Sequence, residues 1–375
     1  MTGVVAARLR AESSPASLVL NAIRVSSPAA RDQLTAQTCL SAATVNRQIT
    51  ALLATGLIVE RPDLVDGGGV GRPKIPLTLD RDQYCVAGMH VGARRTALVI
   101  ADLAGRTLYS HAIRTQELSA IGVDAAVARL CDQLAELAAR FSGRRVLWAG
   151  VASGGTVDEH TGVVDHPILR WQRQPIGPML AEALGVPVSV TEHVQGMAAA
   201  ELLLGGQIAS QGAGLFFYAR ETVGMALVFG DEVHQPTRGA GSIAGVLVEP
   251  GALAVEPVAP LQSVVGRAAL KAAAARLGLD DDCTVLADDR ARVLGSAVAT
   301  LRDVIDPDWV VVAGEAFAAH PRGLAPVQAA FDAATTTPWP LEITPTRFGL
   351  HVPEAAPVAV ALAAVYADPV AVVGR

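Results

Sequence analysis

Apolar and polar positions in the first eighty residues follow the spacing of three short helices and a hairpin. Apolar residues recur at helical spacing over Ser17–Val25, and the Ser26–Pro28 segment breaks that pattern. Pro28 is placed to open a second helix, which ends near Cys39 and Leu40. A third helix is predicted directly after it.

The third predicted helix separates apolar from polar side chains. Ser41 is a natural N-cap, because its hydroxyl can accept a backbone N–H of the first turn, and Gly56 ends the helix. One face carries Val45, Ile49, Leu52 and Leu53, while Ala43, Thr44, Arg47 and Gln48 lie largely on the other face and Asn46 lies near the edge. We therefore expect one buried and one solvent-facing side.

A hairpin follows the third helix. Residues 57–60 and 75–79 are its predicted strands, and the Gly-rich tip at 67–71 leads to Arg72 and Lys74. Three helices followed by a hairpin are typical of a winged helix-turn-helix. The alternative is a small helical bundle whose polar face is merely solvated.

A winged helix of this kind suggests a role for each polar residue. On the third helix, Arg47 is suited to reading guanine and either Asn46 or Gln48 to reading adenine. Ser41 and Thr44 suit phosphate oxygens. Arg72 and Lys74 are placed to reach phosphates or a minor groove. We expect this segment to bind double-stranded operator DNA.

Beyond residue 80, strands alternate with helices. Predicted strands lie at 84–89, 96–101, 107–113, 146–151, 188–191, 214–218, 224–229 and 309–313, and predicted helices at 121–141, 198–204, 261–277, 291–305 and 357–366. This alternation predicts an α/β body built from two similar halves.

Composition sharpens this division. The 375 residues are 51% hydrophobic and 18% charged, with mean hydropathy +0.37, so large cores can form. The net charge is −6, but residues 1–80 carry +2 and the remainder −8. A slightly basic N-terminal segment followed by an acidic remainder is typical of a small nucleic-acid-binding module joined to a larger part that does not bind nucleic acid.

Other functional classes receive no support from the sequence. The four cysteines are widely spaced and form no CxxC pair, which argues against a disulfide framework or a cysteine-based zinc site. We expect no signal peptide, because residues 1–12 carry two arginines and no continuous apolar h-region, and the sequence has no run of eighteen uninterrupted apolar residues. We expect a cytoplasmic protein that does not contact membranes.

The chain resembles the ROK family (repressors, open reading frames and sugar kinases) in its repressor form. The carriers are LSAATVNRQITALLATGLIVE from Leu40, GRP from Gly71, GMHVGARRTALVIADLAGRTL from Gly88, PVSVTEHVQGMAAAELLLG from Pro187 and DPDWVVVAGE from Asp306. The resemblance implies a winged helix over 1–80 and a two-lobed, actin-like ATPase or sugar-kinase fold over 81–375. Lobe one is expected at about 83–193 plus a C-terminal helix at 356–369, and lobe two at about 194–355.

The resemblance also implies that the catalytic positions have changed. The family's kinases bind ATP phosphates and magnesium on a G-x-D-x-G-G-T-K turn, where this chain has His90, Gly92 and Arg94-Arg95. Exposed arginines there could bind an anion or be simply solvated. The family's Asn-Asp pair, whose Asp is the general base, is replaced by Glu192-His193.

The sugar and zinc positions are replaced as well. A sugar-contacting Asn of the family falls on Ile168, and its G-E-x-G-H stretch, which supplies a sugar-binding Glu and a zinc-binding His, reads Gly241 to Gly245 here, with Ser242 in the Glu position. We therefore expect no metal, no cofactor and no kinase activity. His90, His166, Glu192, His193 and Ser242 are candidates to line a changed ligand cleft, or are ordinary structural residues.

The leading hypothesis is a DNA-binding transcriptional regulator, a repressor, that acts as a homodimer or higher oligomer with or without a sugar or other small-molecule effector. One alternative is a sugar kinase that kept its DNA module. Another is an architectural DNA binder whose body only dimerises.

Overall fold

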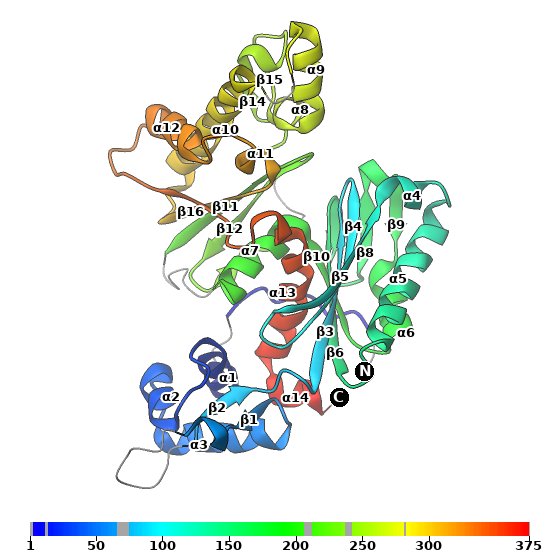
Figure 1. Cartoon of the computed structure of the whole chain (residues 1–375), viewed down its shortest axis with the longest axis vertical. Helices are drawn as coiled ribbons and strands as arrows, with labels where there is room; N and C mark the ends of the chain where they lie inside the picture. Colours follow the sequence, from blue (N-terminus) through cyan, green and yellow to red (C-terminus); the bar gives the residue numbers. More distant parts are fainter. Residues whose placement is uncertain are drawn as a thin grey trace. The chain divides into compact units, whose positions relative to one another are not determined.

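The chain folds into two compact units in the computed structural model, which describes residues 3–11, 14–65, 75–205, 212–236, 242–280 and 283–374 (Figure 1). One unit comprises Met1–Gly206 together with Glu354–Arg375, and the other comprises Gln207–Pro353. The C-terminal segment therefore returns to the N-terminal unit.

The N-terminal unit begins with the three predicted helices and the hairpin. They are α1 (Pro15–Val25), α2 (Arg31–Thr38), α3 (Ala42–Ala54), β1 (Ile58–Glu60), the 3-10 turn η1 (Pro62–Leu64) and β2 (Leu77–Leu79). The expectation that Pro28 opens α2 was wrong. Ala29 instead exchanges backbone hydrogen bonds of 3.0 and 2.9 Å with Leu77, so the backbone stays extended until Arg31.

These helices share one hydrophobic core with the body of the unit. Both α1 and α3 contact the C-terminal α14 (Pro369–Val373), shown in red in Figure 1. The Ser17 hydroxyl donates to the Ala367 carbonyl at 3.0 Å, and the Arg24 guanidinium lies 5.5 Å from the Tyr366 ring centroid. The helix-turn-helix is therefore packed against the body rather than linked to it by a free tether.

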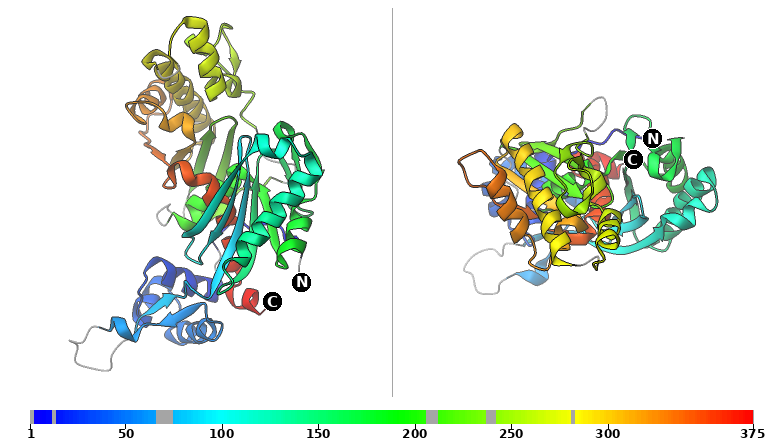
Figure 2. Two further views of the ribbon diagram at one scale, coloured as in Figure 1. Left: turned by 45° about the vertical axis from the view of Figure 1, so that its right-hand side comes forward. Right: turned by 90° about the horizontal axis from the view of Figure 1, so that it is seen from above.

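A five-stranded sheet forms the middle of this unit, in the order β10-β6-β3-β4-β5. Its strands are β3 (Tyr84–Val91), β4 (Arg95–Ala101), β5 (Thr107–Arg114), β6 (Arg145–Ser153) and β10 (Val188–Glu192). The helices α5 (Val123–Ala139) and α6 (Ile176–Leu184) pack on one face of this sheet (Figure 2). The short α4 (Thr115–Ser119) lies between β5 and α5 in the chain. Helix α13 (Val352–Ala367) packs on the other face.

The packing of α13 depends on a glycine. A Cβ atom at Gly150 would overlap the Pro357 carbonyl oxygen. The helix backbone therefore lies directly on β6. The segment Gly349–Ala367 is long and apolar enough to cross a membrane, but 67% of its most apolar window is buried, as in the core helix of a globular unit.

Several elements between β6 and α7 were not predicted. They are β7 (Thr156–Asp158), β8 (Val163–His166), the 3-10 turn η2 (Pro167–Leu169), β9 (Trp171–Gln174) and α6. The three strands form a separate antiparallel sheet. Helix α7 (His193–Leu204) begins at His193 and not at Ala198, because the Glu192 carboxylate caps it by accepting the Val194 and Gln195 N–H groups.

The second unit is built around the sheet β13-β12-β11-β16-β17. Its strands are β11 (Ala213–Ala219), β12 (Val223–Phe229), β13 (Glu232–Val233), β16 (Trp309–Ala313) and β17 (Ile343–Pro345), with a small pair β14 (Leu247–Val248) and β15 (Ala259–Pro260). Its helices are η3 (Gly251–Leu253), α8 (Leu261–Val265), α9 (Arg267–Leu277), α10 (Thr284–Ile305), α11 (Glu315–Ala318), α12 (Ala325–Ala334) and η4 (Gly349–His351). The single helix expected at 261–277 is interrupted at Gly266, which has extended backbone angles.

The two sheets repeat one topology. In the first, β3 pairs antiparallel with β4 and parallel with β6, and β6 pairs parallel with β10. In the second, β11 pairs antiparallel with β12 and parallel with β16, and β16 pairs parallel with β17. The prediction of a duplicated α/β body is confirmed.

Candidate functional site

The outer face of α3 is a row of solvent-exposed side chains. Ala43, Asn46, Arg47 and Thr50 are exposed and recur at i, i+3, i+4 and i+7, while Val45, Ile49 and Leu52 are buried on the opposite side. Thr44 and Gln48 are half-buried at the margins. The exposed row includes Asn46, predicted at the edge, and Thr50, which is not among the predicted DNA contacts.

Arg47 supplies the positive charge of this row. Arg31 is bound to Glu60 at 2.8 Å and Arg61 to Asp63 at 2.6 Å. Arg47 makes no hydrogen bond or ion pair with any residue that the structure describes. Its guanidinium therefore has all its N–H donors available for a partner outside the chain.

Ser41 holds the first turn of α3, as the sequence predicts. Its hydroxyl oxygen accepts the Thr44 N–H at 3.1 Å and lies 2.9 Å from the Thr44 hydroxyl oxygen. Both hydroxyls are thus engaged with each other at the helix N-terminus, where backbone N–H groups and the helix dipole favour an anion.

Two basic residues predicted at the wing, Arg72 and Lys74, lie outside the described residues. The described part of the hairpin pairs Ile58 with Leu79 and Glu60 with Leu77. The Arg61 N–H donates to the Pro76 carbonyl at 2.8 Å at its open end. The contribution of Arg72 and Lys74 to DNA binding remains a prediction.

A second group of polar residues lies at the carboxyl ends of strands in the same unit. His90 lies near the end of β3, His166 at the end of β8, and Glu192-His193 at the junction of β10 and α7. The His90 and His193 rings stack, with centroids 5.7 Å apart and planes 10° apart. A Cβ atom at Gly154, after β6, would lie 3.0 Å from His166 Nε2 and 3.6 Å from His193 Cε1. The structure therefore brings these four predicted residues together.

His166 has one tautomer assigned by its surroundings. Its Nδ1 accepts the Leu169 N–H at 3.4 Å, so the proton of the neutral ring is on Nε2. This Nε2 is buried and has no hydrogen-bond partner among the described residues. Burial lowers the pKa of His166 to about 4, so the ring is neutral at pH 7.

Glu192 and His193 are neutral for the same reason. Burial lowers the pKa of His193 to about 4, with a further contribution from His166. Burial raises the pKa of Glu192 to about 8, although backbone N–H groups that bind the carboxylate oppose this effect. The 3.3 Å contact between His193 Nε2 and Glu192 Oε1 therefore joins two groups that are largely uncharged at pH 7.

The structure adds three residues to this histidine cluster (His90, His166, Glu192 and His193). The Thr191 hydroxyl donates to Glu159 Oε1 at 2.5 Å, and the Trp171 ring lies edge-on to His166 at 6.3 Å between centroids. Glu159 and Trp171 belong to the unpredicted β7–β9 segment, so no sequence signal pointed to them.

The remaining candidates do not belong to this cluster. Ser242 belongs to the second unit, where its hydroxyl accepts the Ala244 N–H at 3.3 Å. Ile168 is 53% exposed, and Arg94 and Arg95 are exposed where β4 begins. Within the described ranges, no group of three or more His, Cys, Asp and Glu side chains is placed to hold a metal ion.

Comparisons with known proteins agree with one another. Residues 86–250 match the ROK family model. The transcriptional regulator Rv0485 of Mycobacterium tuberculosis is 41% identical over 98% of this chain and 89% of its own length, as is the transcriptional regulator Mb0495 of Mycobacterium bovis.

Solved structures show the same fold. A ROK family transcriptional regulator, a homologue of the E. coli MLC protein, matches 96% of this chain and 98% of its own, with a TM-score of 0.75 and 20% identity. A ROK family glucokinase from Streptomyces griseus, in complex with glucose and AMPPNP, matches 74% of this chain and 98% of its own, with a TM-score of 0.59 and 20% identity.

Proposed function

The chain belongs to the ROK family, and on that premise we propose that it is a DNA-binding transcriptional regulator, specifically a repressor. The observation that carries the proposal is the exposed row on α3, in which Arg47 stands beside Asn46 and Thr50 with its guanidinium unengaged. A row of this kind, on the second helix of a helix-turn-helix, is suited to the major groove. The named function of the 41% identical relatives is in keeping with it.

We assign separate tasks to the polar residues of α3. Arg47 reads a guanine through two hydrogen bonds, and Asn46 or Gln48 reads an adenine. Ser41 and Thr44 contact phosphate at the helix N-terminus. Arg72 and Lys74 contact the backbone or the minor groove from the wing. Since one winged helix covers little DNA, the chain acts as a homodimer or higher oligomer on two half-sites. Such a regulator works on DNA in the cytoplasm.

We also propose that the kinase-like part has no kinase activity. The residues that the family's kinases use are replaced in this chain. Glu192-His193 is found where the kinases have the Asn-Asp pair that holds the general base, and His90 and Ile168 are found at the phosphate-turn and sugar-contacting positions. Burial also lowers the pKa of His193, the residue at the general-base position, to about 4, so its ring is a weak base at pH 7. A coupled assay of ATP consumption over a sugar panel tests this, and turnover above the buffer rate would refute it.

The histidine cluster supports a sensor role for this part. It offers a buried, unpartnered N–H on His166 beside neutral rings and a protonated carboxyl, a setting that suits an uncharged polar ligand such as a sugar. A metabolite that raises the melting temperature of the wild type, but not of a His166→Phe variant, would support this role. A body that only dimerises would respond to no metabolite.

DNA binding itself is tested by equilibrium titration of the full chain. The probe is the duplex upstream of the protein's own gene, and the comparison is a shuffled duplex of equal length and composition. We expect tighter binding to the upstream duplex and a steep loss of affinity as salt rises. Equal affinity for both duplexes at every salt concentration would count against a specific regulator.

A further inference from the structure

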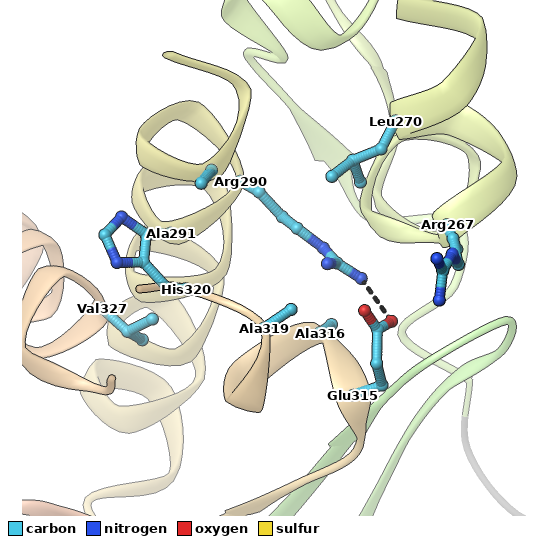
Figure 3. A pocket seen from close by; sticks show the side chains of 10 residues that line it. Arg267, Leu270, Arg290, Ala291, Glu315, Ala316, Ala319, His320 and Val327 are labelled. Carbon is cyan, nitrogen blue, oxygen red and sulfur yellow. Dashed lines mark hydrogen bonds and ion pairs between the residues drawn. The ribbon is translucent and has the colours of Figure 1, made fainter. Parts of the chain in front are cut away.

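A pocket of about 240 Å³ is lined by residues of the second unit alone, none of which belongs to α3 or to the histidine cluster. It is lined by residues of α9, α10, α11, the segment after α11 and the start of α12 (Figure 3). Its walls combine two arginines and one glutamate with small apolar side chains. Nothing in the proposed DNA-binding function uses this space.

One wall of the pocket is a buried charge pair. Arg290, on α10, is 3% exposed, and its Nε donates to the Val265 carbonyl at 2.7 Å. One terminal nitrogen of the same guanidinium lies 3.1 Å from Glu315 Oε2, at the start of α11 (Figure 3). This pair fixes Glu315 and compensates its charge.

Arg267 supplies a second guanidinium at the same place. It is exposed on the first turn of α9 and, like Glu315, lines the pocket (Figure 3). It makes no hydrogen bond or ion pair with any residue in the described ranges. Because the Arg290–Glu315 pair is neutral as a whole, Arg267 leaves the pocket with one uncompensated positive charge.

The rest of the lining is apolar or already satisfied. Leu270, Ala291, Ala319 and Val327 form the apolar surface, together with Ala287 and Ala316. His320 adds no free donor or acceptor, because its Nε2 lies 3.0 Å from Asp288 and its Nδ1 accepts the Arg322 N–H at 3.0 Å. The pocket therefore offers one cationic end and an apolar body.

We propose that this pocket binds a small organic monoanion, a monocarboxylate with a short chain or a single ring. The carboxylate would pair with Arg267, which offers a fork of N–H donors, and the hydrocarbon part would lie against Leu270 and the alanines. The size argues for a small ligand, since pockets for drug-sized molecules measure roughly 300–1,000 Å³. The single excess charge argues for a monoanion over a nucleotide with several phosphate charges.

The test uses the full chain, with benzoate, hexanoate and phenylacetate as probes and benzamide as the uncharged match of benzoate. Calorimetry should detect saturable binding of at least one carboxylate with a Kd below about 1 mM, and no binding of benzamide. Arg267→Gln should weaken that binding by about 10-fold or more, because a hydrogen bond to a charged group is lost. Lys271→Gln, which removes a charge from the same helix outside the pocket, should leave it unchanged.

A variant that fills the pocket with a larger side chain tests whether the carboxylate binds there. Ala319 is exposed and lines the pocket, so Ala319→Leu should abolish carboxylate binding without disturbing the core. The proposal is overturned if none of the three carboxylates binds, if benzamide binds equally well, or if Arg267→Gln and Ala319→Leu both bind like the wild type. Tighter, Ala319-dependent binding of adenosine monophosphate would overturn it in favour of a nucleotide site. DNA binding of the same protein preparations is measured separately by the titration described above.

Discussion

The Tyr84 hydroxyl donates a hydrogen bond of 2.6 Å to the carbonyl of Thr55, the C-cap residue of α3. Tyr84 begins β3, the central strand of the body sheet, and is 4% exposed. The last turn of the proposed recognition helix is therefore bonded directly to the sheet whose other end carries His90. The proposed recognition helix and His90 are therefore connected through a single strand, β3.

We expect Tyr84→Phe to lower the free energy of unfolding by about 1 kcal/mol, the usual net contribution of one hydrogen bond, because the aromatic packing is retained. Urea denaturation measures the change. Tyr109→Phe is the matched control, since Tyr109 is 41% exposed on β5. Equal effects of the two substitutions would contradict the role given to the Tyr84–Thr55 bond.

Ser41→Ala should destabilise the chain by about 1 kcal/mol, because the Thr44 N–H loses its capping acceptor. Ser41→Asn should retain most of the stability, since its side-chain oxygen can cap the same N–H. The midpoints of urea unfolding compare the three proteins. An alanine variant as stable as the wild type would show that the cap contributes nothing.

Gly150→Ala should destabilise the N-terminal unit by about 1–3 kcal/mol or prevent folding, because the added methyl group overlaps the backbone of α13 at Pro357. Gly143→Ala is the control, because nothing lies within 4 Å of a Cβ atom there. Thermal unfolding of both variants tests the packing of α13. A harmless Gly150→Ala would mean that α13 is not held against β6.

The buried histidines predict a pH dependence of stability. The pKa of His166 falls from its ordinary value of 6.5 to about 4 in the folded protein, so between these values the unfolded chain binds more protons. The free energy of unfolding therefore falls as the pH drops from 6.5 toward 4. Glu192 acts in the opposite sense. Its pKa rises from 4.5 to about 8 in the folded protein, so between these values the folded chain binds more protons, and the free energy of unfolding falls as the pH rises from 4.5 to 8.

Substitutions separate these two contributions. From pH 7 to pH 5, His166→Gln should lose less stability than the wild type, whereas the exposed His160→Gln should follow the wild type. From pH 5 to pH 8, Glu192→Gln should lose less stability than the wild type. Urea midpoints at the three pH values give the comparison, and parallel pH profiles for all four proteins would refute the assignment.

The winged helix could be predicted because local chemistry determines it. Ser41, the 3.6-residue spacing of Val45, Ile49 and Leu52, and the stop at Gly56 all act within α3 itself. The start of α2 was wrong because its cause is distant: Ala29 pairs with Leu77, forty-eight residues further along the chain. Local propensity carries no information about such a pairing.

The candidate site shows the same limit. The duplicated body could be predicted from alternating apolar runs, and the closeness of His90 and His193 follows from their places at the ends of β3 and β10. The place of His166 beside them depends on β8, which was not predicted. The short strands β7–β9, which hold Trp171, and the turn after β7, which holds Glu159, have no strong period. The Arg267 pocket is lined by residues from four separate helices, so no local sequence pattern predicts it.

The most direct test of the account is a selection of duplexes from random DNA, carried out in parallel with the wild type and with Arg47→Ala. The wild type should enrich two inverted half-sites about one helical turn apart. Arg47→Ala should enrich the same half-site with one guanine position relaxed, and lose about 10- to 100-fold affinity for the wild-type site. Arg129→Ala, an exposed arginine of α5, should behave as the wild type. Identical enriched sites for Arg47→Ala and the wild type, or no enriched sequence at all, would contradict the assignment of α3 as the recognition helix.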